Sequence, residues 1–207
     1  MTTRVGVVAD THCPEFLDRL PDSVFFVMRG VQLILHAGDI TGRETLEQLA
    51  QIAPVHAVRG DHDRDLDGLP RSREVTVEGR KIVLVHGDRS HWIEEPATFL
   101  WTISLGLFRP HRGLPRTLRR RFPDADVIVY GHTHHSQVQK VGGALVFNPG
   151  GVHVWNSRTA KRRLTQRPGW FEWSWLQVVR HNRRPQPPSV GILEIDEDGI
   201  VPRIIGL

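Results

Sequence analysis

Short apolar runs that each end in a cluster of Asp and His residues are the feature that most constrains how this 207-residue chain can fold. The Val, Ile and Leu content of the runs is typical of buried β-strands. The clusters that follow them are Asp10-Thr11-His12, Gly38-Asp39, Gly60-Asp61-His62-Asp63, His86-Gly87-Asp88 and Gly131-His132-Thr133-His134. Because ligands of α/β sheets collect at the carboxyl ends of strands, we expect these side chains to converge on one site.

The spacing of apolar residues changes along the chain. The first part predicts parallel βαβ units, and the later part predicts antiparallel hairpins that turn at Gly-containing sequences. The expected strands are 4–9, 33–37, 55–59 and 127–130, the expected helices are 23–29 and 43–52, and the expected hairpins are 74–85, 138–147 and 190–205. The most economical architecture is an α/β fold with two β-sheets packed together and covered by helices, in a single domain of residues 1–207.

The net charge of +4 is unevenly distributed. Residues 101–123 hold six Arg and no acidic residue, and residues 156–188 hold eight basic residues and only Glu172. These segments contribute +6 and +7, so the rest of the chain sums to −9. Since they also interrupt the regular pattern, we expect basic insertions at about 90–123 and 156–188.

The cysteine content and the length of the apolar stretches indicate where in the cell the protein is expected. Cys13 is the only cysteine, which excludes an intramolecular disulfide, fits a reducing compartment and favours a role as a small packing residue. The first residues read as a strand and lack the pattern of a secretory signal. The uncharged stretch 96–108 is far shorter than the ~20 residues of a spanning helix. We expect a cytoplasmic protein, with peripheral attachment to a membrane left open.

The mixture of Asp oxygen and His nitrogen, without thiolate, suits Mn²⁺, Fe or Zn²⁺ at a hydrolytic site. Seven good ligands are too many for one catalytic ion that keeps a coordination position open. Two ions that share a carboxylate would use them all. Such pairs lie ~3.5–4 Å apart, activate a hydroxide and clamp the oxygens of an in-line displacement at phosphorus.

The five clusters, in this order, resemble the sequence blocks of the calcineurin-like metallophosphoesterases. The chain looks most similar to the small bacterial phosphodiesterase branch that includes the retromer-subunit-like proteins, over roughly 1–90, 124–155 and 189–207. The resemblance implies a four-layer αββα sandwich of two mixed sheets. It also implies a hydroxide that bridges two divalent ions and attacks phosphorus, with Mn the leading expectation and Fe, Zn, Ni or Co as alternatives.

Matching motifs assign roles to individual residues. The residues implied for the first metal are Asp10, His12 and His134, and those for the second are Asp61, His86 and His132, with Asp39 bridging. The resemblance further implies that His62 contacts phosphate and protonates or stabilises the leaving oxygen, with Asp63 as its orienting partner. Of the other histidines, His36 and His56 are expected to be structural. Five more could touch substrate, with surface roles expected for most of them: His91, His111, His135, His153 and His181.

Asp61 departs from the family pattern, because active members usually have Asn at that place. A further coordinating carboxylate lowers the Lewis acidity of the ions and weakens their attraction for anionic phosphate. A monoanionic diester would lose less from this than a dianionic monoester, so we expect a phosphodiesterase acting on a small anionic substrate. Some non-catalytic retromer-type relatives also carry Asp there.

Two other functions stay open. One is a non-catalytic metal-binding scaffold for protein interactions, and the other is a phosphohydrolase of lipid-linked or nucleotide-linked diphosphates at the membrane surface. The insertion at 156–188 interleaves Trp with basic residues, which suits a lid, a homo-oligomer contact or an anionic membrane surface. Nucleic-acid binding is disfavoured, because Trp residues in such a segment are more often packing anchors than base platforms.

Overall fold

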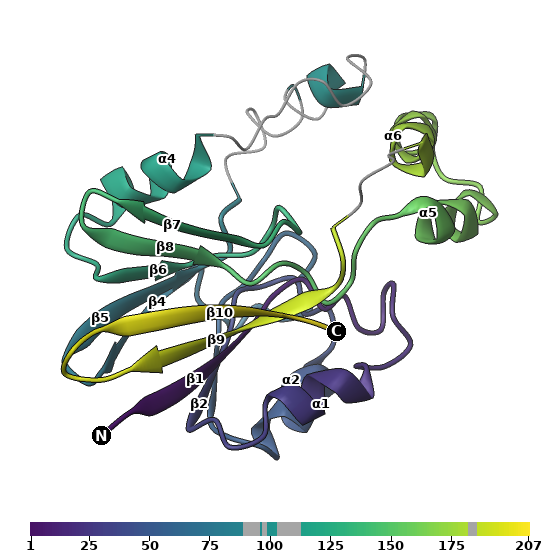
Figure 1. Ribbon diagram of the computed structural model, residues 1–207. Coiled ribbons are helices and arrows are strands. Elements are labelled where there is room, and N and C mark those ends of the chain that lie inside the picture. The colour runs from purple at the N-terminus through teal and green to yellow at the C-terminus, as the bar shows by residue number, and fades with distance from the viewer. Residues whose placement is uncertain (89–95, 97–98, 103–112, 182–185) are drawn as a thin grey trace.

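The computed structural model describes residues 1–88, 96, 99–102, 113–181 and 186–207, and its strands form two five-stranded sheets (Figure 1). One sheet has the order β10 (Ile200–Gly206), β9 (Ser189–Ile195), β1 (Thr3–Val8), β2 (Leu33–His36) and β3 (Val55–Ala57). The other has the order β4 (Ser72–Val77), β5 (Arg80–Val85), β6 (Val127–Val129), β8 (Ala144–Asn148) and β7 (Gln137–Val141).

Both sheets are mixed, as the resemblance implied. In the first, β1, β2 and β3 are parallel, because α1 (Asp22–Val27) and α2 (Arg43–Ala50) provide the crossovers, while β9 runs antiparallel to β1 and β10. In the second, β5, β6 and β8 are parallel, and β4 and β7 join as antiparallel hairpin partners. The predicted hairpins are therefore confirmed. Glu78 and Gly79, at φ 47° and 72°, make the tight turn between β4 and β5.

The main core lies between the two sheets. Val5 and Val7 of β1 belong to the same buried cluster as Leu84 of β5 and Phe147 of β8, all with no exposed surface. On the outer face of the first sheet, residues of α1 and α2 pack against β2 and β9. The outer face of the second sheet is covered by α4 (Leu114–Arg121). The layers are thus helix, sheet, sheet, helix.

Two helices, α5 (Ser157–Leu164) and α6 (Trp170–His181), stand away from the sheets and pack on each other (Figure 1). They share a small buried cluster of Ala160, Leu176 and Val179. The second basic segment is therefore a helical hairpin with its own core. Much of the expected insertion at 90–123 lies outside the described residues. Within the described part of the chain, no helix is both long enough and apolar enough to cross a bilayer.

Candidate metal centre

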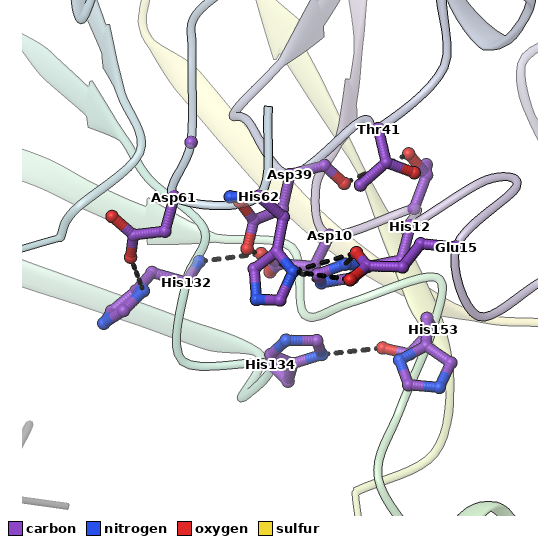
Figure 2. A network of polar contacts seen from close by, with 12 residues as sticks. Asp10, His12, Glu15, Asp39, Thr41, Asp61, His62, His132, His134 and His153 are labelled. Atoms are coloured by element: carbon purple, nitrogen blue, oxygen red, sulfur yellow. Dashed lines mark hydrogen bonds and ion pairs between the residues drawn. The ribbon is translucent and has the colours of Figure 1, made fainter. Parts of the chain in front are cut away.

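The loops that follow five strands carry the predicted site residues to one end of the two sheets (Figure 2). The loops follow β1, β2, β3, β5 and β6. The residues that meet there are Asp10, His12, Asp39, Asp61, His62, Asp63, His86, His132 and His134. The convergence predicted from the strand ends is what the topology produces, because the strands before these loops point the same way within each sheet.

Several of these residues adopt left-handed backbone conformations, which residues other than Gly rarely do. They are Asp10, His12, Asp39, His132 and His134, with φ between 46° and 65°. Each such conformation costs of the order of 1 kcal/mol and persists only where the surroundings enforce it. Such strain is typical of functional sites, and here it coincides with the candidate ligands.

Asp39 lies at the middle of the cluster. Its Oδ2 is 3.5 Å from Nε2 of His12 and 3.4 Å from Nε2 of His86, and its Oδ1 accepts a hydrogen bond of 2.9 Å from the backbone N–H of His62. Burial raises the pKa of Asp39, but the charges of His86 and His12 and the hydrogen bond from the backbone of His62 more than offset it, so the pKa lies well below its usual value. Asp39 is therefore a carboxylate with histidines on either side.

Hydrogen bonds to backbone carbonyls fix how two imidazoles face the cluster. Nδ1 of His86 donates to the carbonyl of Ala37 at 2.8 Å, and Nδ1 of His134 donates to the carbonyl of His153 at 2.7 Å. In each ring this leaves Nε2 for a ligand. Burial lowers the pKa of His134 to about 4, so the ring is neutral near pH 7, the form that binds metals.

Buried polar atoms without a hydrogen-bond partner mark where a cation would bind. Among the described residues they include Oδ2 of Asp10, Nε2 of His12 and Nε2 of His86. Buried polar groups are nearly always satisfied, so such a set calls for a missing partner. Burial raises the pKa of Asp10 to about 6, in line with an uncompensated carboxylate. Oxygen and nitrogen donors without sulfur fit Mn, Fe or Zn.

The candidate ligand atoms fall into overlapping groups, each within 4.8 Å. Among the described residues the groups are Asp61, His86 and His132; Asp10, Asp39 and His86; His12, His134 and His153; and His12, Glu15 and His62. Asp39 belongs to the group with Asp10 and His86, and its Oδ2 also lies 3.5 Å from Nε2 of His12. Asp61 is the outermost member, with its side chain 48% exposed and its Oδ2 3.4 Å from Nδ1 of His132.

His153 lies beside His12 and His134 and is buried, so the surface role expected for most of the histidines outside the clusters does not hold for it. It is only 2% exposed, because its backbone N–H bonds the carbonyl of Asp10 and holds the chain against the end of β1. Burial lowers the pKa of its imidazole to about 3. The apolar run of β8 ends at Phe147, several residues before His153, so the pattern of a cluster directly after a strand gave no signal here.

Asp63 has a different position from the one expected. It is 1% exposed, and its carboxylate accepts hydrogen bonds of 2.7–2.9 Å from four backbone N–H groups, those of Asp39, Ile40, Thr41 and Gly60. The carboxylate that contacts the ring of His62 is Glu15, at 2.8 Å. This hydrogen bond raises the pKa of His62. Asp63 joins the loops after β2 and β3 instead.

A row of aromatic rings joins the site to the helical hairpin. Phe16 packs on His12, with 5.0 Å between ring centroids, and on Trp155 at the same distance. Trp155 packs in turn on Trp175 of α6 at 5.1 Å. The hairpin of α5 and α6 is therefore connected to the site by packed side chains.

Comparisons with known proteins give matches over most of the chain. Residues 3–165 match the calcineurin-like phosphoesterase superfamily domain. A probable metallophosphoesterase of Methanothermobacter thermautotrophicus is 33% identical over 151 residues, which is 72% of this chain and 77% of that protein.

The solved structures of two vacuolar protein sorting 29 (Vps29) proteins share the fold. Vps29 of Cryptosporidium parvum has a TM-score of 0.67 at 22% identity, with 100% of this chain and 92% of that chain covered. Vps29 of Entamoeba histolytica, solved with Zn²⁺, has a TM-score of 0.63 at 21% identity, with 99% of each chain covered.

Proposed function

Because this chain belongs to the calcineurin-like phosphoesterase superfamily, we propose that it is a metal-dependent phosphoesterase, and specifically a phosphodiesterase, formed by residues 1–207 as one domain. The observation that carries the proposal is Asp39, a buried carboxylate with Nε2 atoms of His12 and His86 at 3.5 and 3.4 Å on either side. A carboxylate with imidazole nitrogens this close to one of its oxygens could serve as the ligand that two ions share.

Seven side chains would hold the ions. Those of the first are Asp10, His12 and His134, those of the second are Asp61, His86 and His132, and Asp39 is common to both. Two divalent ions, with Mn first among the candidates, would supply an activated hydroxide and neutralise charge on the phosphoryl oxygens. The unpartnered atoms of Asp10, His12 and His86 support this assignment.

His62 is the proposed proton donor to the leaving oxygen. Its backbone N–H is bound to Asp39, which keeps the residue at the centre, while its side chain is 42% exposed and accessible to substrate. Its raised pKa favours the protonated ring, which is the state a general acid needs. As the P–O bond breaks, the proton passes to the departing oxygen.

The preference for a diester follows from Asp61. Burial raises the pKa of the Asp61 carboxyl group above its usual value, although the nearby charges of His86 and His132 offset part of this effect. As a ligand it would add negative charge at the open side of the site, where it opposes a dianionic phosphate more than a monoanionic one.

The helical hairpin is the proposed contact to an anionic surface. Trp170 and Trp173 of α6 are 76% and 48% exposed, on the same helix face as Arg180. The exposed side of α5 carries Arg158, Lys161 and Arg162. Exposed Trp with cations suits the headgroup region of a bilayer, so we favour a cytoplasmic enzyme that touches a membrane over nucleic-acid binding.

Metal-loaded protein should hydrolyse bis(p-nitrophenyl) phosphate, and chelation should stop the reaction. Asp39→Asn should abolish it because both ions lose their shared ligand. His62→Ala should slow it, and more so with diphenyl phosphate, whose leaving group is more basic and needs the proton more. His181→Ala, at the end of α6, is the matched control and should behave as wild type.

The likeness to Vps29 supports a second candidate, a metal-binding scaffold for protein interactions. A scaffold would bind the ions but would not hydrolyse phosphate esters. A protein with both ion positions filled that hydrolyses neither ester would support the scaffold.

A further inference from the structure

Glu15 lies between two histidines of the site without belonging to any of the predicted clusters. Its Oε2 and Oε1 are 2.8 and 3.1 Å from Nδ1 of His62, and its Oε2 is 3.3 Å from Nδ1 of His12 (Figure 2). The loop after β1 and the loop after β3 therefore meet at one carboxylate, and the contact to His62 is the shorter of the two.

Backbone hydrogen bonds hold both loops, so this contact does not depend on a freely moving segment. The turn that carries Glu15 is closed by the N–H groups of Phe16 and Leu17, which bond the carbonyl of His12 at 2.8 and 3.1 Å. On the other side, the N–H of His62 bonds Asp39 at 2.9 Å. The two side chains thus meet from anchored positions.

The geometry points to Glu15 as the positioning residue for His62, an inference that rests on the proposed function of this site. An imidazole has two nitrogens. Because the carboxylate of Glu15 accepts the hydrogen bond from Nδ1 of His62, Nε2 is the atom that can face a leaving oxygen. Asp63, the residue expected in this role, cannot fill it while its carboxylate accepts four backbone N–H groups.

Ring packing restricts the position of the His62 imidazole. The ring of His62 lies edge-on to that of His12, with 4.7 Å between centroids, and edge-on to Phe16 at 5.8 Å. These contacts restrict the ring but do not select which nitrogen faces outward. The hydrogen bond to Glu15 makes that selection, so its loss should affect proton donation rather than the fold.

Glu15→Ala and Glu15→Gln should separate positioning from other effects. We expect Glu15→Ala to slow hydrolysis of diphenyl phosphate about tenfold, a part of the ~10²–10⁴ typical of general acid catalysis, and to slow hydrolysis of bis(p-nitrophenyl) phosphate by less than about threefold. Glu15→Gln keeps an acceptor oxygen and should restore most of the rate. In a His62→Ala background, Glu15→Ala should have no further effect.

Three results would overturn the inference. They are equal losses on both esters, an undiminished effect of Glu15→Ala when His62 is already Ala, and a loss that merely follows lower metal content, since Glu15 also contacts His12. Metal content should therefore be counted in each variant, and we expect it to stay at the wild-type value.

A structural readout tests the inference even where the wild type hydrolyses neither ester. Crystal structures of the metal-loaded proteins should show His62 in one rotamer in wild type and Glu15→Gln, and in more than one in Glu15→Ala. An unchanged single rotamer in Glu15→Ala would contradict the positioning role. An inactive wild type with this rotamer change would instead count against the proposed function alone.

Discussion

Asp63 illustrates how one buried carboxylate can fix the loops that present a site. It lies next to His62 in the sequence, and adjacency suggested that the two side chains would interact. The fold turns the side chain inward, where four backbone N–H groups surround it. Glu15 comes from a loop 47 residues away in the chain and contacts His62 instead. Neighbours in sequence are poor guides to such contacts, because the path of the loops decides them.

Asp63→Ala should lower the free energy of unfolding by about 3 kcal/mol, because several hydrogen bonds to a charged acceptor are lost inside the protein. Denaturant titration would measure it. Asp65→Ala, at an exposed position in the same loop, is the control and should change stability by less than about 0.5 kcal/mol. Equal stability of the two variants would show that the loops do not depend on this carboxylate.

Asp61→Asn should raise the rate on p-nitrophenyl phosphate relative to bis(p-nitrophenyl) phosphate by about tenfold, which corresponds to about 1.4 kcal/mol of added attraction for the dianion. Steady-state kinetics on both esters gives the ratio. Asp198→Asn removes an exposed carboxylate from the turn between β9 and β10, away from the site, and should leave the ratio unaltered. A constant ratio in Asp61→Asn would remove the explanation for diester preference.

The sequence pattern was sufficient to locate some parts of the site and not others. The Asp and His clusters could be located from sequence because the carboxyl ends of parallel strands lie at the same edge of an α/β sheet. Matching motifs then suggested the roles of the residues. His153 could not be located in this way, because it is buried by backbone pairing with the end of β1 and not by a pattern of its own. The helices α5 and α6 were expected only as an insertion, and their connection to the site through Phe16 and Trp155 arises from tertiary packing.

Vesicle sedimentation would test the role of the helical hairpin. The protein should bind phosphatidylglycerol vesicles more strongly than phosphatidylcholine vesicles, and added salt should weaken the binding because the cations of α5 are screened. Replacing Trp170 and Trp173 with Ser should weaken it further. Phe26→Ser removes an equally exposed aromatic side chain from α1 and should have no effect. Absence of salt-sensitive binding would contradict the membrane contact.

Positive and negative charge lie in different parts of the molecule. Outside residues 101–123 and 156–188 the chain sums to −9, and part of that negative charge consists of the buried carboxylates of Asp10 and Asp39. Those groups need cations to be stable inside the protein. The overall charge of +4 therefore describes the two basic segments rather than the sheets that carry the site.

Chelation should consequently destabilise the whole fold. Removing ions present at a hundred times their dissociation constant should lower the free energy of unfolding by about 2.7 kcal/mol for each ion, and thermal melting with and without EDTA would measure the shift. Asp39→Asn, which lacks the shared ligand, should respond much less. A wild-type melting temperature that neither EDTA nor added Mn²⁺ changes would contradict metal binding by the buried cluster.

The most direct test of the account is a titration of metal-free protein with Mn²⁺, in which bound metal and hydrolysis of bis(p-nitrophenyl) phosphate are followed together. Activity should rise with occupancy and level off at two bound ions per chain. A protein that holds two ions and leaves the diester intact would contradict this expectation.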